Sequence, residues 1–478
     1  MEKTNDRISQ LPDDVLHYIL SKMPMKFIIR TSILSRRWRN LWKPIWAYST
    51  YLNFSVTPEE FVAAVNRYLL LHEAKEIHTL GLLLLSRDPL DAEKWVEFAV
   101  AKRVKELHVI FCQTTVDETF DRRIWKLHNS IFNCDSLTYL HLCVCKFIPP
   151  LNFRGCTYLK TLDLSFVRIT DALFENMLLN FQLLKEFSLW ECVDLTHLKI
   201  SAPNLPLTRL TVVDCWNVND IEIFAPNLQS FHFYGDLFLI NFKNISSLLD
   251  VLINGICRMD WLNGDWMTVL HHLERVKILT LCNVSLKNLS LAEEDTPEDL
   301  PITFLNLQEL QLLMDWFGGS YLARTYSFFK NCLCPCLEKL FIELLYAIED
   351  PSQRNFWCDR QPADDTADIV FCHLKVIKIN GFRGLKDEIQ LVKFFLEKAI
   401  VLESLVLVAP QKAVSDMMKD SASESKSIKA QFVILHDLLL NFAKASSSDA
   451  QILMYEYSDY DGALAPTHAE YYHKDMFV

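Results

Sequence analysis

One pattern of apolar positions recurs through most of the chain. Each copy reads apolar-x-x-apolar-x-apolar, so its last two apolar residues lie two positions apart and face the same side of an extended strand. Consecutive copies begin roughly 20 to 37 residues apart, which is a period typical of stacked repeats. The pattern therefore predicts about thirteen short strands, whose copies begin at Ile77, Val104, Leu137, Leu159, Leu184, Leu207, Leu228, Leu248, Val276, Leu307, Leu337, Leu374 and Leu402.

A single repeat of this kind cannot bury its own apolar side, so it has to stack on its neighbours. The spacing is near that of leucine-rich repeats, which form a curved parallel sheet with a helical or irregular outer side. The word Ala-Pro-Asn-Leu occurs at 202–205 and again at 225–228, each time just before a predicted strand. We therefore predict an α/β fold with a leucine-rich-repeat solenoid over residues 51–350.

Several cysteines fit the repeat register. Cys145, Cys192 and Cys215 each come three residues after the last apolar strand position, where the leucine-rich pattern carries Asn or Cys. Cys332, Cys334 and Cys336 suggest a zinc site, but C-x-C is not the usual pair spacing and no second pair follows at the expected distance. Buried thiols are favoured over zinc, and no metal is expected.

The first fifty residues have a helical period instead. Apolar residues at helical spacing follow Pro12, and Pro24 ends that helix. A second helix is predicted over 26–34 and a third from Ser35, which is a suitable N-cap. Three such short helices make a poor independent core, so the next domain or a partner protein has to cover their apolar surface.

Charge and composition narrow the function. The net charge is −12, which argues against a general nucleic-acid binder, and only 10 glycines leave little room for phosphate-binding loops. A local basic cluster spans residues 22–43 and is either a solvated helix face or a site for an acidic protein partner, with nucleic acid a minor option. With neither a signal peptide nor an apolar run long enough for a bilayer, we expect a protein of the nucleus and/or cytoplasm with reduced cysteines and no membrane partner.

The N-terminal segment, 6–42, resembles the F-box. The matching words are DRISQLPDDVLHYILSKMP and IRTSILSRRWRNLW; Phe27 departs from the pattern, because plant versions usually carry an acidic helix cap there. The resemblance implies a three-helix F-box over 1–50 that docks on a Skp-type adaptor and, through it, on a cullin scaffold. By position, the implied adaptor contacts are Leu11, Pro12, Val15, Leu16, Ile19, Pro24, Ile29 and Trp38.

Residues 372–408 resemble the FBD domain of plant F-box proteins. The word Gly-Phe-Arg-Gly at 381–384 is followed by an amphipathic segment and a further strand pattern. The resemblance implies an FBD-like unit over 351–445 that caps the repeat stack. Residues 446–478 lack a convincing period and are expected to form either a flexible tail or a docking peptide.

The two resemblances imply a non-catalytic substrate receptor of a Skp–cullin–F-box ubiquitin ligase. The sequence contains no G-x-x-x-x-G-K-[ST], H-E-x-x-H or G-x-S-x-G, so neither an enzyme nor a cofactor is expected. An unknown protein substrate would bind the concave strand surface. The candidate residues there are Tyr139, His141, Asp163, Glu186, Trp190, Arg209, His232 and Tyr234.

Two alternatives stay open. In the first, the chain is an interaction scaffold that assembles into no ligase, which Phe27 and the long tail support. In the second, the chain is an F-box receptor that needs a small-molecule co-ligand on the concave surface.

Overall fold

The computed structural model describes residues 8, 10–23, 25–47, 49–54, 61–84, 90–111, 125–126, 129–150, 155–201, 203–236, 239–256, 266–283, 285–286, 302–314, 319–344, 368–410, 434–444, 450–460, 462 and 464–469. The chain divides into two compact units, Met1–Leu195 and Thr196–Val478, which we describe separately as unit 1 and unit 2. Three segments whose composition is typical of loops, at 292–301, 348–368 and 411–429, lie wholly or almost wholly outside the described residues.

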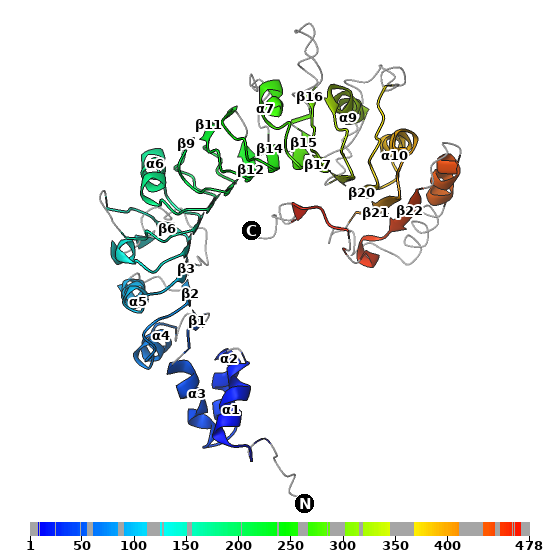
Figure 1. Ribbon diagram of the computed structural model, residues 1–478. Coiled ribbons are helices and arrows are strands. Elements are labelled where there is room, and N and C mark those ends of the chain that lie inside the picture. The colour runs from blue at the N-terminus through cyan, green and yellow to red at the C-terminus, as the bar shows by residue number, and fades with distance from the viewer. Residues whose placement is uncertain are drawn as a thin grey trace, which may run out of the picture. The chain divides into compact units, whose positions relative to one another are not determined.

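Unit 1 begins with the three predicted helices (Figure 1). They are α1 (Asp13–Ser21), α2 (Met25–Arg30), which continues into a 3-10 turn, and α3 (Trp38–Ala47). Ser35 lies before α3 as predicted, and its Oγ accepts a 3.5 Å hydrogen bond from the Trp38 amide. Because α2 begins at Met25, Phe27 lies inside the helix and not at its N-cap.

The rest of unit 1 is a parallel sheet with helices on one side (Figure 1). Its strands pair in chain order, so each is hydrogen-bonded to the strand of the next repeat. They are β1 (Tyr51–Phe54), β2 (Thr79–Leu84), β3 (Glu106–Phe111), β5 (Tyr139–Cys143), β7 (Thr161–Ser165) and β8 (Glu186–Trp190), with α4 (Phe61–Leu70), α5 (Leu90–Ala101) and α6 (Asp171–Asn180).

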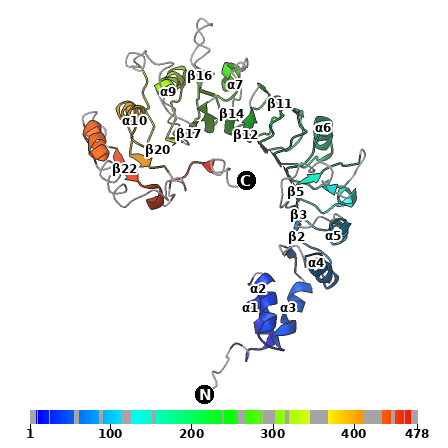
Figure 2. The ribbon, with the colours of Figure 1, turned by 180° about the vertical axis from the view of Figure 1, so that it is seen from behind.

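Unit 2 repeats this plan, as Figure 2 shows from behind. Its main parallel sheet consists of β10 (Arg209–Val213), β12 (Ser230–Asp236), β14 (Asp250–Ile256), β15 (Ile278–Cys282), β17 (Glu309–Met314), β19 (Lys339–Leu344), β20 (Val376–Asn380), β21 (Ser404–Val408) and β22 (Gln451–Tyr455). Its helices are α7 (Trp266–His272), α9 (Gly319–Asn331), α10 (Lys386–Lys398) and residues 434–444. A second parallel sheet joins β9 (His197–Ser201), β11 (Asp220–Phe224) and β13 (Leu239–Lys243).

The repeat prediction is confirmed. Each of the thirteen predicted copies coincides with a strand that begins two residues after the first apolar position. The paired apolar residues, such as Leu140 and Leu142 of β5, are buried on the side that carries the helices. The residues between and beside them point the other way, and we call that side of the strands the helix-free face. The sheet also contains β1 and β22, which lack the pattern and were not predicted.

A left-handed residue ends many of these strands. Val144, Phe166, Glu191 and Asp214 follow β5, β7, β8 and β10 with φ between 49° and 59°. The residue after each is apolar and buried: Cys145, Val167, Cys192 and Cys215. The turn therefore directs the next side chain into the core, which explains the repeated cysteine position. Gly381, with φ of 73°, stands at the same place after β20 and precedes the buried Phe382.

We predict that Gly381→Ala destabilises unit 2 far more than Gly462→Ala. Both glycines have φ near +73°, so either alanine costs about 1 kcal/mol in backbone conformation. A Cβ at Gly381 would additionally meet the Leu344 backbone oxygen at 2.1 Å, whereas a Cβ at Gly462 meets nothing within 4 Å. Thermal unfolding of the two variants tests this, and equal midpoints would contradict it.

Candidate functional site

The N-terminal helices are tied together at the Leu-Pro entry. Arg37, from the turn before α3, donates hydrogen bonds to the Leu11 carbonyl at 2.5 Å and to Asp13 Oδ1 at 2.9 Å. Pro12 precedes α1 with φ of −58° and ψ of 152°, which sets the extended entry. The segments Leu-Pro-Asp, at 11–13, and Ser-Arg-Arg-Trp, at 35–38, are therefore in direct contact.

These helices present apolar side chains to solvent. Val15 and Ile19 lie one turn apart on α1 and are 41% and 40% exposed, while Pro12 is exposed and Leu11 is partly buried. Further exposed apolar residues nearby, which the sequence analysis did not include among the contacts, are Tyr18, Met23, Phe27, Ile33 and Leu34. We call Val15, Tyr18, Ile19, Met23, Phe27, Ile33 and Leu34 the exposed apolar set.

Two of the predicted adaptor contacts need correction. Leu16 and Trp38 are 0% and 4% exposed, because they form the small core of the helices together with Leu20, Ile28 and Leu41. They support the helices from inside and offer little surface themselves. Pro24 lies outside the described residues, and Ile29 is described only as part of the α2 backbone.

A polar cluster lies on the helix-free face of unit 1. Tyr139 Oη donates a 2.5 Å hydrogen bond to Asp163 Oδ2 on the next strand. The ring of His108 lies 4.8 Å from that of Tyr139 and 5.9 Å from that of His141. Parallel pairing aligns His108, His141 and Asp163 in one row, because each stands between the two core positions of its strand. His108 was not among the candidate residues, although it has the same position in its strand as His141 and Asp163.

This cluster carries negative charge. Burial raises the pKa of Tyr139, and the bond to Asp163 and the carboxylates of Glu106 and Glu186 raise it further. Burial also lowers the pKa values of His108 and His141, which favours the neutral form of both rings. The carboxyl groups that act on Tyr139 are those of Asp163, Glu106 and Glu186. Of the other predicted residues in unit 1, Glu186 and Trp190 are half-buried at the two ends of β8.

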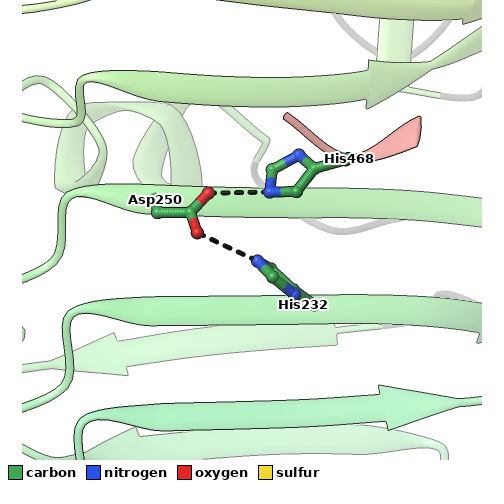
Figure 3. Close-up of side chains that lie close together, drawn as sticks. All are labelled: His232, Asp250 and His468. Atoms are coloured by element: carbon green, nitrogen blue, oxygen red, sulfur yellow. Dashed lines mark hydrogen bonds and ion pairs between the residues drawn. The ribbon is translucent and has the colours of Figure 1, made fainter. Parts of the chain in front are cut away.

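In unit 2, Arg209 is exposed and Tyr234 is half-buried, with its ring 6.4 Å from that of Trp216. His232 requires a correction: it is only 4% exposed and does not lie on an open surface. The physical reason is a segment within 446–478, which was expected to be either a flexible tail or a docking peptide. After β22, residues 464–469 lie over the helix-free face and cover His232 (Figure 3).

His232, Asp250 and His468 form a buried triad (Figure 3). His232 Nε2 lies 3.1 Å from Asp250 Oδ2, and His468 Nε2 lies 2.7 Å from Asp250 Oδ1. Burial raises the pKa of Asp250, but its hydrogen bonds with the two histidines outweigh burial and leave that pKa below its usual value. Asp250 and His468 were absent from our candidates because nothing in the local sequence joins them.

The triad is also the one group of three or more His, Cys, Asp or Glu side chains, among the residues that the structure describes, that lie close enough to share a metal ion. Its 2.7 Å and 3.1 Å separations are hydrogen-bond distances, whereas two ligand atoms of a tetrahedral zinc ion lie about 3.3 Å apart. Cys332, Cys334 and Cys336 form no such group; Cys332 is buried and Cys336 is exposed.

Comparison with known proteins agrees with the geometry. The F-box domain matches residues 8–46, and the At1g61320/AtMIF1 leucine-rich-repeat domain matches residues 70–448. The chain belongs to the F-box/LRR proteins. Among similar proteins of Arabidopsis thaliana, the putative FBD-associated F-box protein At5g56440 is 28% identical over 84% of this chain and 92% of its own length.

Other relatives agree in domain content. The FBD-associated F-box protein At1g61320 is 26% identical, with 90% of this chain and 95% of its own length covered. The F-box/FBD/LRR-repeat protein At1g13570 is 24% identical, with 91% and 100% covered. In the described part of this F-box/LRR protein, no helix has the length and apolar character needed to cross a membrane.

We predict a sharp difference in thiol reactivity within this F-box/LRR protein. Burial raises the pKa values of the Cys156 and Cys332 thiols to about 12, whereas Cys336 and Cys372 are exposed. At pH 8, iodoacetamide should modify the two exposed thiols at least about a hundredfold faster than the two buried ones. Peptide mapping by mass spectrometry measures the rates, and the unfolded chain is the control. Equal rates in the folded chain would show that the cores around Cys156 and Cys332 are open.

Proposed function

We propose that this chain is the substrate-recognition subunit of a Skp–cullin–F-box ubiquitin ligase. The observation that carries the proposal is the exposed apolar set on the F-box helices, which the helices' own small core leaves uncovered. Such a set next to a long repeat sheet suits a protein that connects an adaptor to a second partner. The F-box match and the names of the relatives support the same function.

The adaptor would bind the F-box through apolar contact. Burial of apolar area contributes about 25 cal/mol per Å², so Val15 and Ile19 with their neighbours supply a useful anchor before the cost of association. Lys22, Arg30, Arg36, Arg39 and Lys43 are exposed on the same helices, which favours an adaptor with an acidic surface. The cullin scaffold would be reached through this adaptor.

The substrate would bind the helix-free face, where the carboxylates around Tyr139 favour a basic protein segment. The chain itself would contribute proximity between substrate and ubiquitin donor and perform no chemistry. We keep residues 1–50, 51–350 and 351–445 as the proposed F-box, repeat and FBD-like regions, and the nucleus and/or cytoplasm as the proposed compartment. The last region, 446–478, includes β22, so part of it belongs to the sheet.

The alternatives receive less support. Phe27 was one reason to consider a scaffold outside any ligase, but it lies inside α2 with its ring on the exposed side, 5.9 Å from the Arg30 guanidinium. There it adds to the apolar surface that an adaptor would cover. No observation on the described residues favours a small-molecule co-ligand.

We predict that Val15→Asp combined with Ile19→Asp abolishes copurification of the intact chain with a plant Skp-type adaptor. Charges at the centre of an apolar contact lose burial and add desolvation, so affinity should fall at least about a hundredfold. Leu11→Ala with Pro12→Ala, which alters the entry to α1, should also weaken the complex. Copurification and isothermal titration with purified adaptor measure the effect.

The matched control is Leu179→Asp with Leu183→Asp, which changes two exposed leucines outside the F-box. This variant should bind the adaptor like the unchanged chain. A folded, unchanged chain that binds none of several plant adaptors would refute the ligase proposal and favour the scaffold.

A further inference from the structure

Residues 464–469 are held on the helix-free face of unit 2 along four strands. Lys378 of β20 donates a 2.7 Å hydrogen bond to the Leu464 carbonyl. The Thr467 amide donates to Glu309 Oε1 of β17 at 2.8 Å. His468 contacts Thr280 of β15 and Asp250 of β14 and is 1% exposed.

The strand residues beneath this segment are polar, which is unusual for buried sheet positions. Thr280 and Gln311 are fully buried, and Lys378 and Glu309 nearly so, although all four belong to the helix-free face. Burial lowers the pKa of Lys378, whose ammonium group also lies 4.2 Å from the centre of the Tyr460 ring. The face therefore has the composition of a binding surface. Here, residues 464–469 of the same chain supply the partners of its polar groups.

The hydrogen-bond directions define what this site recognises. Glu309 Oε1 accepts from Gln311 Nε2 at 2.6 Å, which leaves Gln311 Oε1 to accept from the Thr280 hydroxyl at 2.8 Å. The single Thr280 hydrogen is thus used, so Thr280 Oγ1 accepts from His468 Nδ1 at 2.7 Å. On the other side of the ring, His468 Nε2 lies 2.7 Å from Asp250 Oδ1.

Asp250 Oδ1 is the oxygen that faces the His468 ring. Its other oxygen, Oδ2, accepts from Ser230 Oγ at 2.9 Å and lies 3.1 Å from His232 Nε2. The site thus places two oxygens, Thr280 Oγ1 and Asp250 Oδ1, on opposite sides of one planar ring: the first accepts a hydrogen bond from Nδ1, and the second lies 2.7 Å from Nε2. A histidine side chain, which carries one nitrogen on each side of its ring, fits this arrangement.

We propose that this site recognises a histidine-bearing peptide of the substrate, and that residues 464–469 are a built-in competitor which the substrate displaces. The inference rests on the proposed function, because it assumes that substrate binds the helix-free face. It adds the chemistry of the recognised segment, and it adds a regulated site in unit 2, distinct from the acidic cluster of unit 1.

The test uses the full chain and a labelled synthetic peptide of residues 462–470. Thr467→Pro with His468→Ala removes the amide donor to Glu309 and the ring, and so releases the segment. Ala465→Ser is the matched control, because Ala465 is exposed between the same contacts. Fluorescence anisotropy measures peptide binding, and hydrogen exchange measures protection of the Thr467 amide in the unchanged chain and in the control.

We expect the released variant to bind the peptide at least about tenfold more tightly than the unchanged chain, because an internal competitor acts at a high effective concentration. A peptide in which alanine replaces its histidine should bind at least about tenfold more weakly, and Ala465→Ser should behave like the unchanged chain. The Thr467 amide should be protected from hydrogen exchange in the unchanged chain and in the Ala465→Ser variant.

Equal peptide binding by the unchanged and released chains would overturn the proposal, and so would an absence of binding up to about 1 mM peptide. An unprotected Thr467 amide in the unchanged chain would overturn it as well. Adaptor binding, measured on the same preparations, is independent of this site. Loss of adaptor binding with retained peptide binding would therefore refute the ligase function alone.

Discussion

The structure depends on the burial of two apolar side chains per strand between the sheet and the layer that covers it. In β7, Leu162 and Leu164 are fully buried, and the corresponding pairs in the other repeats are buried in the same way. Because each repeat covers part of its neighbour, the pair is stable only in the stack. On the opposite face of β5 and β7, Tyr139 and Asp163 are only half-buried, so these residues are not tied to that packing.

The F-box helices, in contrast, leave much of their apolar surface exposed. Their core consists of few side chains, and the remaining apolar residues stay at the surface. The bonds from Arg37 to Leu11 and Asp13 hold the entry segment against the α3 end of the bundle, so the exposed set has a fixed geometry without a large core. A rigid apolar surface loses little conformational freedom when it is covered, which suits a docking module.

The strands could be predicted from the sequence because each one carries two apolar residues at alternate positions, preceded three residues earlier by another apolar residue. This pattern can be recognised within six consecutive residues. The same reasoning could not separate Leu16 from Val15, because both are aliphatic residues of one short helix and only the packing of α3 decides which is buried. It missed β22, whose residues Ile452 and Met454 lack the leading leucine. It also placed His232 on an open surface, since the residue that covers it, His468, lies far along the chain and carries no motif.

The closure of residues 464–469 over the strands also changes how unit 2 assembles. In a solenoid each repeat contacts its neighbours, so structure can spread along the chain from any repeat. Here Thr467 is bonded to Glu309, 158 positions earlier, and His468 to Thr280, 188 positions earlier. Synthesis proceeds from the N-terminus, so these links form only after residues 467 and 468 have emerged. Burial of the polar row from Asp250 to Lys378 is therefore a late step in the assembly of unit 2.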